Sequence, residues 1–344
     1  MMGLAKTAYT LIICIASVFI LIYLESILIP FVFAVIIWFL IKEFRNISNK
    51  ITFVNRLFPN WLLNLVAFVI IFGLITVFSK ILSSNISQLM NELPKYEANI
   101  SKLIKQGNAV LGMDILNEMH LAIESYNFTS ILKQLFNSLS GVLGNIFLVI
   151  LYVIFLLLEE EYLPSKLRGI FPINEQFQSS RELFQEIDKS IGSYIVLKTV
   201  ISLITGILSY TALVLIGVDF PIFWAILIFL LNYIPTVGSL FATVFPALTA
   251  LLQFGEIGPS ILVLSCIGTV QLIVGNFIEP KLMGNSLNIS SLVVLLSLAF
   301  WGLVWGVVGM ILCVPITVIL IILFSRFEAT KPIAILLSGT GKIK

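Results

Sequence analysis

The amino-acid sequence predicts an all-α, polytopic membrane protein. Of its 344 residues, 59% are hydrophobic and only 11% are charged, and the mean hydropathy is +1.09. Several apolar runs exceed the roughly 18 residues that mark a membrane-spanning helix. The strands of a transmembrane barrel would instead alternate apolar and polar residues in segments of about ten. These runs are apolar throughout, so we expect about eight helical transmembrane segments.

The N-terminal residues 1–78 are predicted to form three transmembrane helices. Apolar runs cover residues 8–24, 27–41 and 61–78, and a basic loop at 42–60 separates the second run from the third. We interpret the first run as a helix that stays in the membrane, because it lacks the small-residue cleavage site of a signal peptide.

A change of character at residue 79 indicates a helical insert outside the membrane. Residues 79–137 mix charges of both signs with apolar residues at helical spacing, such as Ile86, Leu89 and Leu93, which is typical of an amphipathic helix. A fourth transmembrane helix is predicted over 138–158.

The C-terminal half is predicted to carry the transport unit, over residues 191–325. A polar, amphipathic linker at 159–190 precedes it and a polar tail at 326–344 follows it. Within it, the blocks 220–253 and 291–324 each contain 34 apolar-rich residues. A straight helix of that length would measure about 51 Å, against a hydrocarbon core of about 30 Å.

Both blocks are predicted to be broken in the middle. The first contains "NYIPTVG", where Pro235 removes a backbone donor, and the second contains "WGLVWGVVG". At an offset of 69 residues Pro246 falls on Pro315, so the two helix-plus-broken-segment units resemble a duplication. The residues assigned to helix-break architecture are Pro235, Gly238, Pro280, Gly284, Gly302, Gly306, Gly309 and Pro315.

Two topologies are compatible with these breaks. Each block is either one long, kinked span or a re-entrant hairpin with its tip at the break. The kinked spans would place Glu279 outside the cell, and the hairpins would place it at the cytoplasmic side. The hairpins would also make the two units inverted repeats, a common plan among transporters with discontinuous helices.

The distribution of positive charge predicts that both termini are cytoplasmic. Lys6 and the segments 42–60, 159–198 and 326–344 hold 14 of the 20 Lys and Arg residues. Cytoplasmic loops are enriched in Lys and Arg. The insert 79–137 would then be extracytoplasmic.

Glu279 is the strongest candidate for a functional residue. An ionisable group near membrane depth is costly and usually functional. It binds a coupling cation or proton on one interpretation, and it caps a helix end on the other. Asn276 lies one turn earlier, so the two side chains can face one site. Pro280 is interpreted as forcing Glu279 out of helical geometry.

Two of three further residues have two interpretations each. Asn232, in the first break, coordinates a cation or solute, or it satisfies the backbone of the broken helix. Trp301, in the second break, stacks on a ligand together with Trp305 or, as we favour, packs at the break. Lys198 is expected to snorkel to the membrane interface. We place Glu279, Asn276, Asn232 and Trp301 on the predicted path of the solute or coupling ion.

The C-terminal stretch "NFIEPKLMGNSLNISSLVVLLSLAFWGLVWGVVGMILCVP" resembles the signature of the AI-2E family of transporters. Residues that match it are Asn276, Glu279, Pro280, Gly284 and Leu292–Val294. An earlier family motif resembles "LNYIPTVG", which includes Asn232, Pro235 and Gly238. The resemblance covers nearly the whole chain and is specific in the last 150 residues.

The sequence also departs from the family pattern. The family often has Pro where this chain has Ser239 and Ser291, and Gly-Gln where it has Leu197 and Lys198. The family includes exporters of the autoinducer-2 signal, permeases and members described as Na⁺/H⁺ antiporters. The resemblance therefore implies a multi-pass protein of the bacterial inner membrane, assembled as a homo-oligomer such as a pentamer.

The expected function is that of a secondary transporter, which exports a small polar molecule such as an autoinducer-2-type signal by alternating access. Cation/proton antiport is the alternative, and a non-transporting structural role of the insert is the second alternative. No G-x-x-x-x-G-K-[ST] motif is present, which disfavours ATP-driven transport. We assign no catalytic residue, metal or cofactor. The expected partners are the lipid bilayer, a small polar solute, Na⁺ or H⁺, and further copies of the chain, but no nucleic acid.

Overall fold

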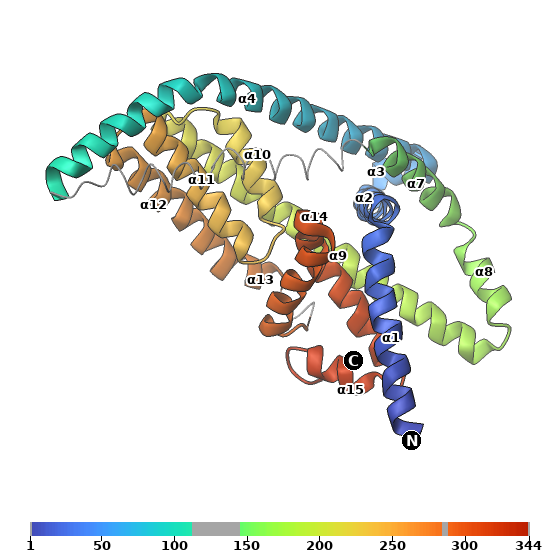
Figure 1. Cartoon of the computed structure of the whole chain (residues 1–344). Helices are drawn as coiled ribbons and strands as arrows, with labels where there is room; N and C mark the ends of the chain where they lie inside the picture. Colours follow the sequence, from blue (N-terminus) through green and yellow to red (C-terminus); the bar gives the residue numbers. More distant parts are fainter. Residues whose placement is uncertain (1, 112–144, 284–287, 343–344) are drawn as a thin grey trace. The chain divides into compact units, whose positions relative to one another are not determined.

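A computed structural model describes residues 2–111, 145–283 and 288–342, and these residues are almost entirely helical (Figure 1). The predicted break residue Gly284 and residues 112–137 of the predicted insert lie outside the described residues. The prediction of an all-α, polytopic membrane protein is confirmed.

Six of the described helices are long and apolar enough to cross a membrane. They are α2 (Glu25–Asn49), the part Asn60–Asn85 of α4 (Asn60–Leu111), α9 (Asn174–Ile216), α11 (Val237–Phe254), α12 (Ile257–Ile273) together with its continuation to Met283, and α14 (Ser291–Ser325). The other described helices are α1 (Met2–Tyr23), α3 (Thr52–Leu57), α7 (Ile146–Glu159), α8 (Leu163–Ile170), α10 (Pro221–Leu231), α13 (Glu279–Met283) and α15 (Lys331–Leu337). The candidate spanning helices carry exposed large apolar side chains, such as Leu215 in α9 and Leu303 in α14, as expected of surfaces that contact lipid.

The chain divides into two compact units, each built from separate segments. The first unit comprises Met1–Ala67, Asn137–Ile195 and Ser286–Lys344, and the second comprises Phe68–Phe136 and Val196–Asn285. Each unit contains one of the two broken blocks.

In the first unit, charged side chains join α2, α7 and the start of α9. Arg45 forms an ion pair with Glu160 at 2.6 Å, and Trp38 Nε1 donates a hydrogen bond to the same carboxylate at 3.1 Å. Lys42 pairs with Asp188 at 2.7 Å. These contacts hold α2 against the end of α7 and against the polar first part of α9.

The block 291–324 folds back on itself. Within α14 the backbone leaves helical geometry at Trp305 (φ −130°, ψ 19°) and Gly306 (φ 59°, ψ −140°). Gly306 thus adopts a conformation that residues with a Cβ atom rarely adopt. Beyond the turn, Thr317 Oγ1 donates to Ser297 Oγ at 2.8 Å, although 20 residues of straight helix would separate them by about 30 Å. The block is therefore a helical hairpin.

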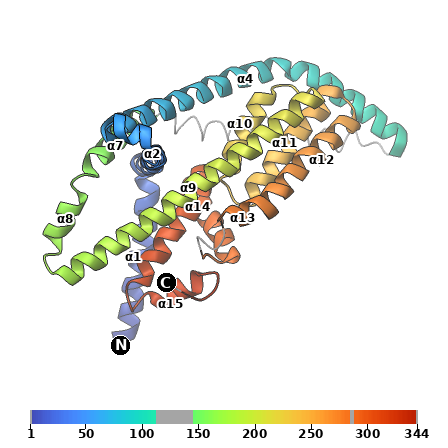
Figure 2. The same cartoon turned by 180° about the vertical axis from the view of Figure 1, so that it is seen from behind.

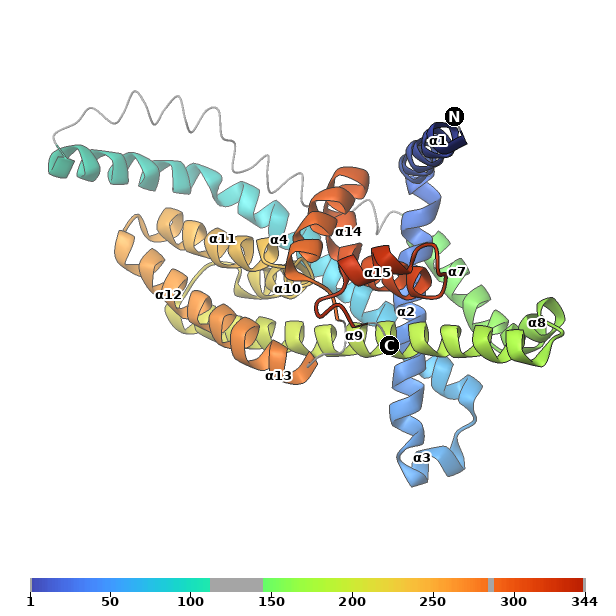
Figure 3. The same ribbon diagram turned by 90° about the horizontal axis from the view of Figure 1, so that it is seen from below.

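Other elements of the first unit surround this hairpin. Trp305 Nε1 at its tip donates to the carbonyl of Leu21 in α1 at 3.0 Å. At its base, an isolated bridge pairs Ile289 with Ser338, and α15 packs beside α14 (Figure 3).

In the second unit, the block 220–253 is also a hairpin. Its halves, α10 and α11, pack against each other, and α11 packs on α12 (Figure 2). Residues 232–236 form the turn between them. At the base, the backbone N–H of Asp219 donates to Gln253 Oε1 at 2.7 Å, and Gln253 Nε2 donates to the carbonyl of Gly217 at 2.9 Å. These bonds join the two ends of the block directly.

The helix α4 continues from the third predicted span into the insert without a break at residue 79. Its later part contacts the base of the hairpin 220–253, which is called the first hairpin because it comes first in the sequence. Asn99 Nδ2 donates to the carbonyls of Leu252 and Gln253, each at 2.8 Å, and so satisfies carbonyls that a helix end leaves unpaired. Tyr96 Oη donates to Asp219 Oδ2 at 3.0 Å. Burial is the main cause that raises the pKa of Tyr96, and this hydrogen bond is the second. The phenol is therefore protonated and can act as a donor.

We expect the substitution Asn99→Ala to weaken the attachment of the insert to the hairpin. It removes two hydrogen bonds and leaves two carbonyls unpaired, a loss of about 1–3 kcal/mol. The melting temperature of the purified protein in detergent should fall, and residues 79–111 should become more sensitive to protease. Gln88→Ala, at an exposed position on the same helix, is the matched control. Equal melting temperatures for the two variants would contradict this role of Asn99.

Candidate functional site

The apolar part of α9 carries a buried lysine that is paired with an acid. Lys198 Nζ lies 2.5 Å from Glu279 Oε1, and the two side chains are 6% and 26% exposed. Lys198 therefore does not snorkel to an interface as expected, because Glu279 provides a counterion within the second unit. A buried charge is tolerated when it is paired in this way.

Glu279 reaches Lys198 from a widened helical turn. Residues Val274–Ile278 form a π-helix between α12 and α13, and the N–H of Glu279 donates to the carbonyl of Val274, five residues back. Such turns are rare in proteins, and those that occur are often found at functional sites. The expectation that Pro280 forces Glu279 out of helical geometry is wrong, since Glu279 is helical (φ −59°, ψ −50°). We attribute this to the π turn, which relieves the clash of a proline ring with the carbonyl four residues back.

The tip of the first hairpin contacts α9 close to this ion pair in sequence. Asn232 Nδ2 donates to Ser202 Oγ at 3.1 Å, and a hydrogen bond of 2.7 Å joins Thr199 Oγ1 and Tyr233 Oη. Lys198, Thr199 and Ser202 all lie within about one turn of α9. Two polar contacts and one ion pair therefore converge on one turn of this helix.

The other predicted site residues lie elsewhere. Asn276 is exposed within the π turn. Trp301 belongs to the first unit, where it is buried and packs against Trp305 with 5.2 Å between ring centroids. Of the predicted site residues, Glu279 and Asn232 thus contact the same turn of α9.

Sequence reasoning missed Thr199, Ser202 and Tyr233. A usable signal was present, because Lys198, Ser202, Thr205 and Ser209 recur at intervals of four, three and four residues in an apolar helix. That spacing places polar groups along one face.

A comparison with protein families assigns this chain to a known group. The family model described as "AI-2E family transporter" matches residues 11–329, which include both hairpins and the whole candidate site. The chain belongs to the AI-2E family of transporters.

Curated relatives agree with this assignment. The AI-2 transport protein TqsA of Escherichia coli strain K12 is 36% identical over 265 residues, which are 76% of each chain. The E. coli protein YhhT, named provisionally as a transport protein, is 33% identical over 78% of this chain and 77% of its own. A protein of Borreliella burgdorferi, named in the same way, is 32% identical over 74% and 70%. This AI-2E family member is therefore similar to transport proteins over most of its length.

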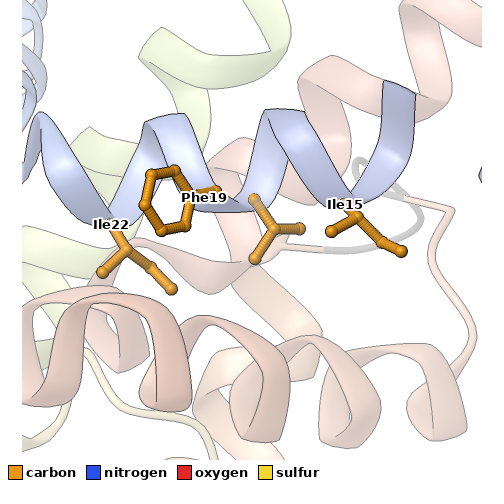
Figure 4. A pocket seen from close by; sticks show the side chains of 4 residues that line it. Ile15, Phe19 and Ile22 are labelled. Carbon is orange, nitrogen blue, oxygen red and sulfur yellow. The ribbon is translucent and has the colours of Figure 1, made fainter. Parts of the chain in front are cut away.

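One apolar depression lies in the first unit of this AI-2E family member. It is lined by Ile15, Val18, Phe19 and Ile22 on α1 (Figure 4). None of these side chains offers a hydrogen bond or a charge, so the depression suits a lipid chain rather than a polar solute.

Proposed function

We propose that this protein is a secondary transporter that exports a small polar solute by alternating access, and that Lys198 and Glu279 couple solute movement to an ion. The observation that carries the proposal is their ion pair on the turn of α9 that also contacts the first hairpin tip. Discontinuous helices with polar groups at their breaks are a common plan for transporter binding sites. A proton or cation that takes the place of the Lys198 ammonium on Glu279 would break the contact between α9 and the π turn.

An autoinducer-2-type signal is the proposed solute, since TqsA carries that signal in its name. Na⁺/H⁺ antiport is the second candidate, because a carboxylate paired with an ammonium can exchange that partner for another cation. Both candidates use Glu279, and they differ in which species crosses the membrane together with the exchanged charge. Residues 79–137 acting alone, as a non-transporting structural element, would need neither Lys198 nor Glu279.

Flux measurements in proteoliposomes distinguish these candidates. Efflux of small polar sugars and Na⁺-driven proton movement should be compared for the wild type and for Glu279→Gln. We expect one of the two fluxes in the wild type and at least a tenfold loss in the variant, a difference of about 1.4 kcal/mol or more. Full flux in Glu279→Gln would exclude the coupling role, and absence of both fluxes in the wild type would exclude transport of either kind.

We also propose that both hairpins are re-entrant and that Glu279 lies at the cytoplasmic side. Lys198 lies near the start of the apolar part of α9, which follows the polar linker 159–190 that the positive-inside rule assigns to the cytoplasm. A re-entrant first hairpin returns the chain to the side from which it entered. The helix α12 then crosses back and brings Glu279 to the level of Lys198, where the ion pair is found. A long, kinked span in place of the hairpin would put Glu279 on the opposite side from Lys198.

Cysteine labelling tests this orientation. In a background without the native cysteines, Lys281→Cys, at an exposed position next to Pro280, should react with an impermeant thiol reagent only from the cytoplasmic side. Gln88→Cys in the insert should react only from the opposite side. Labelling of both positions from the same side would refute the arrangement.

A further inference from the structure

The buried face of α9 is more polar than its packing requires. Lys198, Ser202, Thr205 and Ser209 follow one another along this face, and none is more than 5% exposed. From Lys198 to Ser209 the face extends about 16 Å along the helix axis, about half the thickness of the hydrocarbon core. Buried positions of this kind are usually apolar.

The element that covers this face is α10, the apolar first half of the first hairpin. A Cβ atom on Gly206 would lie 3.2 Å from the carbonyl oxygen of Ala225 and 3.5 Å from Phe229 Cβ. Together with the bond between Asn232 and Ser202, this contact shows that α10 runs antiparallel to α9. Continuing the pairing by one turn brings Ser209 to the level of the first turn of α10, which carries Trp224.

Two polar atoms in this region are buried without a partner. Ser209 Oγ and Trp224 Nε1 have no hydrogen bond to any residue that the structure describes, and both side chains are completely buried. A buried polar group without a hydrogen-bond partner destabilises the folded protein. Thr205, by contrast, donates to the carbonyl of Ile201 at 2.8 Å. Alanine at 209 and phenylalanine at 224 would fill space without this penalty, so packing alone does not account for these residues.

We propose that the α9–α10 interface is a solute-binding site, in which Ser209 Oγ and Trp224 Nε1 bind hydroxyl groups of the solute when the hairpin moves away from α9. Ser202 and Asn232, which bond to each other in this conformation, complete the site. The proposal rests on the proposed transport function and adds the location of the site and the class of solute.

The chemistry of the interface selects an uncharged, hydroxyl-bearing solute. Ser202, Thr205, Ser209, Trp224 and Asn232 are all neutral hydrogen-bonding groups. The charge at the end of the face is already paired, since Lys198 bonds to Glu279. A charged solute would have to enter a buried interface without a free counterion, which is costly.

Cysteine accessibility tests the site with simple polyols in place of the natural solute. In the background without native cysteines, Ser209→Cys should react with a charged methanethiosulfonate reagent, because opening of the interface admits water. The matched control is Leu208→Cys, at a position that is 44% exposed on the outer, apolar side of α9 and that should react at least tenfold more slowly. Ribose, xylitol and glycerol are then added one at a time, with NaCl as the ionic comparison.

We expect at least one of the polyols to slow the labelling of Ser209→Cys several-fold and NaCl to leave it unchanged. Reaction no faster than that of Leu208→Cys, or labelling that no polyol slows, would overturn the proposed site. Protection by NaCl instead would overturn the assignment of an uncharged solute. If flux still depends on Glu279 in any of those cases, the proposed function survives and only this site fails. If a polyol slows the labelling of Ser209→Cys but the wild type shows neither flux, the binding site survives and the proposed transport function fails.

Discussion

Replacement of Glu279 by Gln is expected to abolish coupled transport and also to destabilise the protein. The variant leaves the Lys198 ammonium buried without a counterion. Removal of one partner from a buried ion pair costs about 3–5 kcal/mol, and we expect about 1–3 kcal/mol here because the Glu279 side chain is 26% exposed. A lower melting temperature in detergent and loss of flux in proteoliposomes would be measured together.

A double variant separates the two effects. Lys198→Gln combined with Glu279→Gln removes both charges, so most of the lost stability should return while coupled flux stays absent. Lys198→Gln alone should destabilise less than Glu279→Gln, because the charge that it leaves unpaired is the more exposed of the two. If the double variant melts as low as Glu279→Gln, the loss of stability does not come from the unpaired ammonium.

The substitution Gly238→Ala is expected to disrupt the tip of the first hairpin. A Cβ atom on Gly238 would lie 1.8 Å from the carbonyl oxygen of Leu231, and that backbone atom cannot move without displacing the end of α10. Strain of this kind typically costs about 1–3 kcal/mol, and here it falls on the turn that holds Asn232. We expect less folded protein and at least a tenfold loss of flux in the protein that does fold.

The matched control is Gly73→Ala in α4, where an added Cβ meets no atom within 4 Å. Alanine is a better helix former than glycine, so Gly73→Ala should be neutral or slightly stabilising. Fluorescence size-exclusion profiles and flux should be compared between the two variants. A normal profile and normal flux for Gly238→Ala would show that the tip tolerates rearrangement and would contradict its positioning role.

The sequence was sufficient to predict the helices and the positions of the breaks, because both depend on local chemistry. Apolar runs determined where α2, α9 and α12 lie, and Pro235 marked the turn at 232–236. The second turn, at Trp305 and Gly306, fell within the predicted interruption. Gly238 and Gly309 have equivalent surroundings, since a Cβ on Gly309 would lie 1.8 Å from the carbonyl oxygen of Trp301.

The choice between kinked spans and hairpins could not be made from the breaks, because both arrangements need the same interruptions. Contacts between distant residues decided how the blocks fold, namely Asp219 with Gln253 and Ser297 with Thr317. The length of α4 was also missed. A change from an apolar to an amphipathic pattern marks a change of surroundings, and the backbone can remain helical through it.

The partner of Glu279 was hidden for a different reason. Sequence spacing placed Asn276 and Glu279 on the same helix face, on the assumption of regular α-helical geometry. The π turn over Val274–Ile278 does not follow that geometry. Lys198 was assessed by its distance from the end of its own helix, although its environment is determined by a residue 81 positions away. Ion pairs of this kind depend on tertiary structure and leave no local pattern.

The π turn makes the position of Glu279 depend on the number of residues before it as well as on their identity. Each residue of an α-helix advances the side-chain direction by about 100°, so a helix one residue shorter between Val274 and Ile278 would turn Glu279 to a different side. A relative could then retain Asn276, Glu279, Pro280 and the lysine and still lack the ion pair. Among homologous chains, a single-residue gap at this point would separate members that share the coupling chemistry from members that share only the motif.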